Sequence, residues 1–248
     1  MTTTFLRALA FPLLLLAAGG LAWRPVEVHL AGDSTMAEKR PEKRPETGWG
    51  EALQRHFRAS KVRVVNHAMN GRSTRTFIGE GRWQALVDSL HRGDWVLVQF
   101  GHNDESKEKV DRYTPPDDFR RNLARFVADV RARRANPVLL TPVRRRKFDA
   151  SGALVDTHGE YPDLVRAVAA EQRVPLLDLH ARTGELLVAW GPDSSRRLFL
   201  QLPAGANPNY PAGLEDNTHF SPLGAELVAG LVAAELRARV PGLAKRLR

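Results

Sequence analysis

The chain has 248 residues, of which 43% are hydrophobic and 26% charged, as in a globular protein able to bury a sizeable core in one domain. It contains no cysteine, which excludes disulfides, thiolate metal sites and a cysteine nucleophile. Its formal net charge of +9 favours encounters with polyanions such as pectic acids, lipid headgroups or nucleic acid, but does not choose among them.

The N-terminal segment has the pattern of a secretory signal. Arg7 precedes a strongly apolar run at residues 9–18, and small residues follow this run as far as Ala22. The run is too short to span a bilayer comfortably. We therefore expect a signal peptide at residues 1–22, a mature domain at 23–248, and a secreted or periplasmic bacterial protein. A retained signal anchor is the alternative.

Runs with strand character alternate with runs of helical periodicity along the rest of the chain. The expected strands are one that starts at Val26 and ends at Gly32, and others at residues 61–66, 94–100, 137–142 and 174–179. The expected helices lie at residues 48–59, 82–91, 116–134, 161–172 and 181–190, with a closing helix from Pro222 to Leu236. Residues 38–45, a Glu-Lys-Arg-Pro unit written twice, are expected to form a solvated loop. Residues 191–217 lack periodicity and are expected to form a long loop.

Alternation of five strands with helices predicts an α/β fold: a single-domain, three-layer α/β/α structure around a five-stranded, parallel, doubly wound sheet. The carboxyl ends of all five strands then lie along one edge of the sheet, where ligands bind in such folds. Ser34, Gly71 and Asn103 each follow a predicted strand, so we expect them to meet at this edge.

A serine hydroxyl becomes nucleophilic at neutral pH only when a base lies within hydrogen-bond reach. His219 is the candidate base for Ser34, because Asp216 lies three residues before it and can accept from its second ring nitrogen. The amides of Ser34 and Gly71 and the side chain of Asn103 are candidate donors to an oxyanion. The alternatives are an ordinary polar turn at Ser34, a surface Asp/His pair, and turn residues at the other two positions.

Taken together, four segments resemble the SGNH (GDSL-like) hydrolase family. They are Gly32-Asp33-Ser34-Thr35, the segment centred on Gly71, Gly101-His102-Asn103-Asp104 and Asp216-Asn217-Thr218-His219. The resemblance implies a flavodoxin-like fold with Ser34 as nucleophile, Asp216 and His219 as the rest of a triad, and Gly71 and Asn103 as oxyanion donors. It also implies that Asp33 supports the turn of the nucleophile.

Over most of residues 26–238 the chain also resembles the rhamnogalacturonan acetylesterase branch of that family. The similar segments are Asn70-Gly71-Arg72-Ser73, Thr141-Pro142-Val143 with the arginines after it, and residues 156–162 and 216–224. Members of this branch remove acetyl groups from pectic polysaccharide. Arg72, Arg144 and Arg145 are therefore candidates to bind uronate carboxylates, for which the guanidinium fork is suited. A solvated surface is the alternative for the basic run at residues 144–147.

These observations predict a secreted serine esterase that hydrolyses acetyl esters on rhamnogalacturonan-type pectic polysaccharide through an acyl-enzyme. We expect no metal and no organic cofactor, since no His-Glu-x-x-His, Walker or Gly-x-Gly-x-x-Gly pattern occurs. We also expect no nucleic-acid partner, no stable membrane partner after removal of the signal, and a monomer. A lipase or thioesterase, or a non-catalytic polyanion-binding protein on the same fold, are the alternatives.

Overall fold

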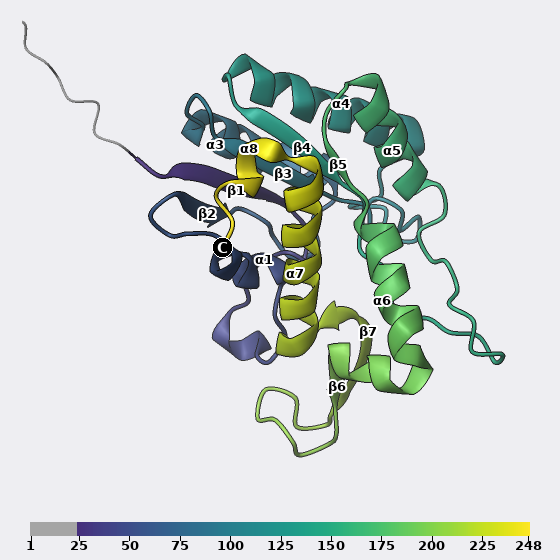
Figure 1. Ribbon diagram of the computed structural model, residues 1–248. Coiled ribbons are helices and arrows are strands. Elements are labelled where there is room, and N and C mark those ends of the chain that lie inside the picture. Colours follow the sequence, from purple (N-terminus) through teal and green to yellow (C-terminus); the bar gives the residue numbers. More distant parts are fainter. Residues whose placement is uncertain (1–23) are drawn as a thin grey trace, which may run out of the picture.

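The expected five-stranded parallel sheet is the centre of the computed structural model, which describes residues 24–248 (Figure 1). Its strand order is β2-β1-β3-β4-β5, with neighbours paired in parallel. The strands are β1 (Val26–Gly32), β2 (Val62–Asn66), β3 (Trp95–Gln99), β4 (Asn136–Leu140) and β5 (Leu176–Leu177). The signal peptide expected at residues 1–22 lies outside the described residues.

Helices cover both faces of the sheet, giving the expected three layers (Figure 1). They are α1 (Trp49–Ala52), α2 (Thr74–Gly79), α3 (Arg82–Ser89), α4 (Pro116–Ala132), α5 (Tyr161–Glu171), α6 (Leu179–Ser194), α7 (Pro222–Arg239) and α8 (Pro241–Ala244). Three short 3-10 turns are η1 (Pro41–Lys43), η2 (Leu53–His56) and η3 (Ser195–Leu198). Within residues 24–248, no helix is long and apolar enough to cross a bilayer.

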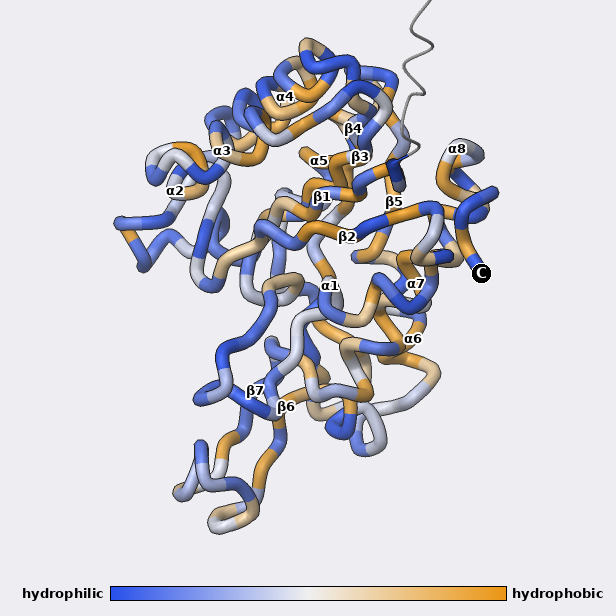
Figure 2. The backbone as a smooth tube through the Cα atoms, turned by 90° about the vertical axis from the view of Figure 1, so that its left-hand side faces the viewer, coloured by the Kyte–Doolittle hydropathy of each residue, from blue (hydrophilic) through white to orange (hydrophobic). Residues whose placement is uncertain are grey.

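The buried strands contribute side chains to two hydrophobic cores, one on each face of the sheet, because successive side chains point to opposite faces. In β3, Leu97 joins the core under α1, α6 and α7, whereas Val96 and Val98 join the core under α2, α3, α4 and α5. All three are at most 1% exposed, which explains why this strand is an almost continuous apolar run in the sequence. The tube in Figure 2 shows the same apolar centre with hydrophilic segments around it.

The prediction of a long loop at residues 191–217 is wrong. The chain there completes α6, passes through η3 and forms an antiparallel hairpin of β6 (Phe199–Leu202) and β7 (Leu214–Phe220). Phe199 pairs with Phe220, and their ring centroids are 5.4 Å apart. The hairpin extends away from the main sheet (Figure 2). Its turn carries the Pro, Gly and Asn residues that mask the strands in the sequence.

Smaller differences concern the lengths of elements. The helix expected at residues 48–59 is one turn of α1 followed by η2, and the sequence does not predict α2, which has only six residues. The fifth strand is shorter than expected because Asp178 ends it: its side chain accepts a hydrogen bond from the amide of Ala181 and caps α6. None of these differences moves the carboxyl edge of the sheet.

Candidate functional site

Ser34 lies in a tight turn directly after β1, at the point where the sheet order places β2 on one side and β3 on the other. Gly32 permits this turn, since a Cβ at that position would lie 2.8 Å from the carbonyl oxygen of Gln99. Asp33 then fixes the turn: its Oδ1 accepts from the amide of Thr35 at 2.9 Å and from its hydroxyl at 2.8 Å. The serine is therefore held at the carboxyl edge, with 8% of its surface exposed.

Asp216, His219 and Ser34 form one continuous series of hydrogen bonds. His219 Nε2 lies 2.9 Å from Ser34 Oγ, and His219 Nδ1 lies 2.6 Å from Asp216 Oδ2. The second oxygen of Asp216 accepts from the amides of Thr218 and His219, at 2.6 and 2.9 Å. Burial opposes the negative charge of Asp216, but the bonds from His219 and these amides outweigh it, and its pKa lies below the usual range. The carboxylate is therefore ionised and orients the imidazole.

The candidate oxyanion donors line the same cavity as Ser34. Gly71 has a φ of +75°, a backbone conformation that favours glycine. Asn103 donates one of its two amide hydrogens from Nδ2 to the carbonyl oxygen of Arg72 at 3.0 Å, which fixes the orientation of the side chain. Its other amide hydrogen remains for a ligand in the cavity.

This cavity has a volume of about 440 Å³, within the range of small-molecule sites. Its lining residues are all polar or charged apart from one glycine. They are Ser34, Lys43, Glu46, Asn70, Gly71, His102, Asn103, Lys109, Arg112, Arg145, Thr218 and His219. Four of these side chains are cationic, and the sequence pattern does not single out Lys43, Lys109 or Arg112. Their positions in charged surface loops gave no signal of a shared cavity.

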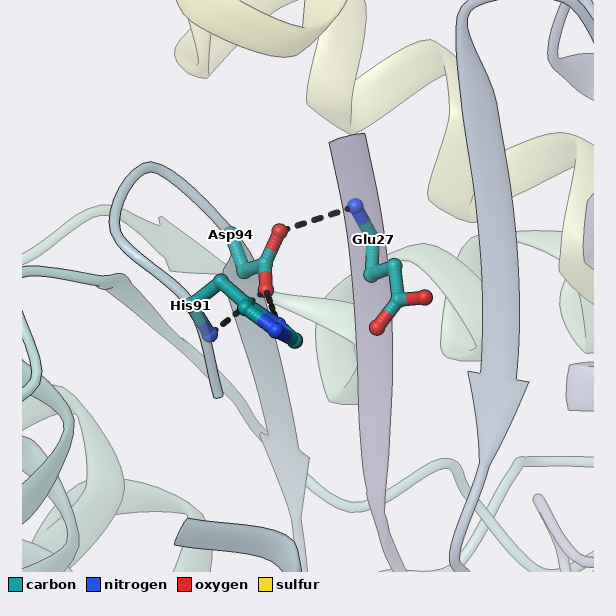
Figure 3. A group of neighbouring side chains, drawn as sticks. All are labelled: Glu27, His91 and Asp94. Atoms are coloured by element: carbon teal, nitrogen blue, oxygen red, sulfur yellow. Dashed lines mark hydrogen bonds and ion pairs between the residues drawn. The ribbon is translucent and has the colours of Figure 1, made fainter. Parts of the chain in front are cut away.

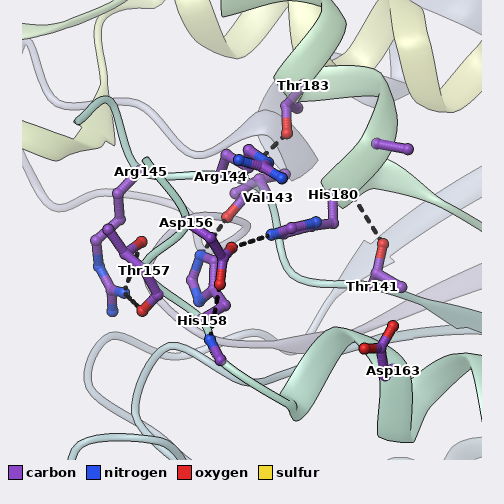
Figure 4. Close-up of polar contacts among 12 residues, drawn as sticks. Thr141, Val143, Arg144, Arg145, Asp156, Thr157, His158, Asp163, His180 and Thr183 are labelled. Atoms are coloured by element: carbon purple, nitrogen blue, oxygen red, sulfur yellow. Dashed lines mark hydrogen bonds and ion pairs between the residues drawn. The ribbon is translucent and has the colours of Figure 1, made fainter. Parts of the chain in front are cut away.

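The three arginines expected to bind substrate take different positions. Arg145 lines the cavity, but its guanidinium is already bound by Glu105 and by backbone oxygens. Arg144 lies outside it: its amide donates to Thr183 Oγ1 at 2.9 Å, and its side chain packs against Gly184 of α6. In Figure 4, Arg145 points towards Thr157 and Arg144 towards α6.

Arg72, the third of these arginines, does not line the cavity with its side chain. Its guanidinium donates to Glu80 and to the carbonyl oxygen of Asn70, so it braces the loop that carries Gly71. The contact of Arg72 with Asn103 is made by its backbone, because its carbonyl oxygen accepts a hydrogen bond from Asn103 Nδ2.

Comparison with known proteins agrees with this geometry. Residues 30–227 match the GDSL-like Lipase/Acylhydrolase family. The chain belongs to this family. It is 45% identical over 210 residues to rhamnogalacturonan acetylesterase RhgT of Bacillus subtilis, with 85% of this chain and 89% of the relative covered.

Solved structures show the same GDSL-like fold. Protein YxiM of Bacillus subtilis matches with a TM-score of 0.74 and 23% identity, over 87% of this chain and 57% of that chain. Axe2, an acetylxylan esterase from Geobacillus stearothermophilus, matches with a TM-score of 0.60 and 19% identity, over 85% of this chain and 94% of that chain. At these identities the likeness concerns the fold.

Behind the serine turn of this GDSL-like chain lies a buried series of titratable side chains. Asp33 Oδ2 is 3.2 Å from His102 Nδ1, the rings of His102 and His158 meet edge to face at 4.6 Å, and His158 Nδ1 lies 2.7 Å from Glu105 Oε2. Burial lowers the pKa of His102, although Asp33 opposes this, so the ring is neutral near pH 7. These contacts hold the turn of Ser34 against the segment that carries Asn103.

At the opposite, amino edge of the sheet lies a group of side chains of the types that bind metal ions. Glu27, His91 and Asp94 place their ligand atoms within 4.8 Å of one another (Figure 3). Arg24, however, donates to both oxygens of Asp94, at 2.8 and 2.9 Å, and Arg63 donates to Glu27 from Nε at 2.8 Å. Two guanidinium groups already balance the two carboxylates, so the cluster is explained as an ion network that ties β1, β2 and β3 together.

Proposed function

We propose that this protein is a carbohydrate acetylesterase in which Ser34 attacks the acetyl carbonyl. Membership of the GDSL-like family makes the chain a carboxylic ester hydrolase. The observation that carries the proposal is the series Asp216–His219–Ser34, with both connecting distances below 3 Å, opening into a cavity of polar side chains. A nucleophile, a base within reach and an orienting carboxylate are the three parts that serine hydrolysis requires.

In the proposed mechanism, His219 Nε2 takes the proton of Ser34 as Oγ attacks the ester carbonyl. Asp216 accepts from Nδ1–H, keeps the ring in the required tautomer and stabilises the imidazolium that forms. The amides of Ser34 and Gly71 and the free N–H of Asn103 stabilise the oxyanion. His219 then protonates the leaving sugar oxygen, which departs as a hydroxyl group. The neutral ring next takes a proton from the water that attacks the acyl-enzyme and returns it to Ser34 Oγ as acetate leaves.

The walls of the cavity support a short acyl group on an acidic carbohydrate. Among the described residues that line it, no large apolar side chain is present to bury a long acyl chain, as a lipase substrate would require. Lys43 and Lys109 are exposed lysines, and Arg112 has its guanidinium 3.3 Å from Asp111. Their positive charge suits the carboxylates of a pectic polymer, and the name of the relative RhgT, a rhamnogalacturonan acetylesterase, supports the same substrate class.

Export is part of the proposal, because a pectic polymer is degraded outside the cell and residues 1–22 have the pattern of a signal peptide. Expression of the full chain in a bacterial host should yield a protein that begins near Trp23 in the periplasm or medium. A chain that keeps residue 1 and sediments with membranes would contradict cleavage and release, and would favour the retained anchor.

The central experiment compares acetate release by the wild type and by Ser34→Ala on acetylated rhamnogalacturonan, acetylated xylan and short- and long-chain 4-nitrophenyl esters. We expect the wild type to prefer the acetylated pectic polymer and Ser34→Ala to lose at least about 10³-fold in kcat. Equal rates for the two proteins would refute the catalytic role of Ser34. A preference for long acyl chains would refute the carbohydrate acetylesterase and favour a lipase.

A further inference from the structure

Lys39 belongs to residues 38–45, which the sequence predicts to be a solvated loop, but Lys39 is buried. Its side chain is 0% exposed and its ammonium group contacts three oxygens of the site. Nζ donates to the carbonyl oxygen of Ser34, donates to Asn70 Oδ1 at 2.8 Å, and lies 2.8 Å from Glu46 Oε1. Lysine is almost never fully buried unless it is paired, so this position requires the carboxylate of Glu46.

The two ends of this ion pair lie beside different parts of the reaction centre. Lys39 holds Asn70, whose neighbour Gly71 is a candidate oxyanion donor. Glu46 Oε1 lies 3.9 Å from His219 Nε2, the atom that takes the proton of Ser34. Glu46 also lines the cavity and is 6% exposed, so it is not free to turn into solvent.

These positions match the charge that develops during ester hydrolysis. Negative charge forms on the oxyanion beside Gly71, and positive charge forms on the ring of His219. A fixed cation that bonds to Asn70 and a fixed anion next to His219 are arranged with the signs that stabilise both. The backbone reinforces the arrangement: the amide of Thr47, the residue after Glu46, donates to the carbonyl oxygen of Phe220 at 3.1 Å. This bond ties the loop to β7 beside His219.

We propose that Lys39 and Glu46 are positioning residues of this esterase, a fixed ion pair whose cation secures the oxyanion loop and whose anion stabilises the protonated form of His219. The inference rests on the proposed function. Stabilisation of the loop alone does not account for the pair, since apolar residues of similar volume usually stabilise a buried site at least as well. Burial lowers the pKa of Lys39, and the negative charge of Glu46 opposes this effect.

Other charged groups also lie near His219, and the substitutions proposed below leave them unchanged. Asp216 contacts the other ring nitrogen, Nδ1. Burial, together with the negative charges of Glu46 and Asp216, raises the pKa of Tyr210. The cations that line the cavity with His219 are Lys43, Lys109, Arg112 and Arg145.

Glu46→Gln tests the anion, and the repeat supplies a matched control. Glu42 stands four residues earlier, at the start of the second Glu-Lys-Arg-Pro unit that Glu46 directly follows; it is exposed and does not line the cavity. With 4-nitrophenyl acetate, we expect Glu46→Gln to lower kcat about tenfold and to move the acidic limb of the kcat/KM profile about one unit towards lower pH, with little change in KM. Glu42→Gln should behave as the wild type. An unchanged pH profile and kcat for Glu46→Gln would overturn the inference.

The cation is tested by Lys39→Met together with the double variant Lys39→Met/Glu46→Gln, which avoids an unpaired buried carboxylate. We expect the double variant to keep a thermal midpoint close to that of the wild type and to lose at least about tenfold in kcat. A folded double variant with the kcat of the wild type would refute the positioning role. A different result would refute the proposed function itself, namely equal acetate release by the wild type and Ser34→Ala.

Discussion

Asp216 and His219 are held in register by one strand: Oδ2 of the aspartate lies 2.6 Å from Nδ1 of the histidine, while Oδ1 accepts from the amide of the same histidine. The backbone of β7 thus fixes the orientation of the carboxylate, independently of its bond to the imidazole ring. Asp216→Asn preserves the shape and the acceptor at Oδ1, but presents an N–H to Nδ1 and so favours the wrong tautomer of the imidazole. We expect kcat to fall about 10³- to 10⁴-fold with unchanged circular dichroism.

The matched control for this substitution is Glu215→Gln, one residue earlier on β7, where the side chain is 78% exposed. It should leave kcat within twofold of the wild type. A comparably small effect of Asp216→Asn would mean that His219 does not depend on this carboxylate.

A second prediction concerns Asn103, whose Nδ2 donates to the carbonyl oxygen of Arg72 and so holds its remaining N–H towards the cavity. Asn103→Ala should lower kcat about 10²- to 10³-fold with little change in KM, because the lost bond forms with the transition state. Asn103→Asp should be at least as severe, since a carboxylate repels the oxyanion. Kinetics on 4-nitrophenyl acetate measure both. A higher KM at unchanged kcat would assign Asn103 to ground-state binding instead.

The sheet and the meeting of distant residues could be predicted from the sequence because they follow from general rules. Apolar runs such as Val96–Leu97–Val98 indicate a strand buried on both faces, and parallel strands bring their carboxyl ends to one edge. This reasoning brings Ser34 and Asn103, which are 69 positions apart in the sequence, together without any contact information. The structure places both on the wall of one cavity.

Other features depend on side-chain direction, which the same rules do not give. Arg144 and Arg145 are neighbours, separated from the end of β4 by three residues, but their side chains take different directions: Arg145 lines the cavity, whereas Arg144 packs against α6 (Figure 4). β7 is composed largely of polar residues because it carries Asp216 and His219, and it therefore lacks the alternation of a strand. Nothing in the repeat distinguishes buried Lys39 from exposed Lys43, since the burial of Lys39 depends on Glu46 and on oxygens distant in the sequence.

A third prediction follows from the cations of the cavity. Lys43→Ala/Lys109→Ala should lower kcat/KM on an acetylated polyuronate about three- to tenfold at low ionic strength, and the loss should shrink as salt is added. Hydrolysis of a neutral acetyl ester should change less than twofold. Lys107→Ala removes an exposed lysine that does not line the cavity and serves as the control. Equal losses on neutral and acidic substrates would show that these lysines do not recognise carboxylates.

The last prediction concerns the pH dependence of stability. Asp104 is 0% exposed, and its Oδ1 accepts from the amide and hydroxyl of Thr74 at 2.8 and 2.6 Å. Burial raises its pKa from 3.8 to about 7, against the opposing effect of these bonds. Since the folded state holds this proton more tightly than the unfolded state, the stabilisation from Asp104 is fully present below about pH 4 and is lost as the pH rises to about 7.

Asp104→Asn removes this titration while keeping the acceptor for Thr74. The free energy of unfolding of the variant, relative to the wild type, should therefore increase by about 1 kcal/mol per unit between pH 4 and 7 and level off above pH 7. Urea denaturation at five pH values measures it, with Asp193→Asn, at an exposed position, as the control whose difference from the wild type stays constant. A constant difference for Asp104→Asn would mean that Asp104 is ionised in the folded protein throughout this range.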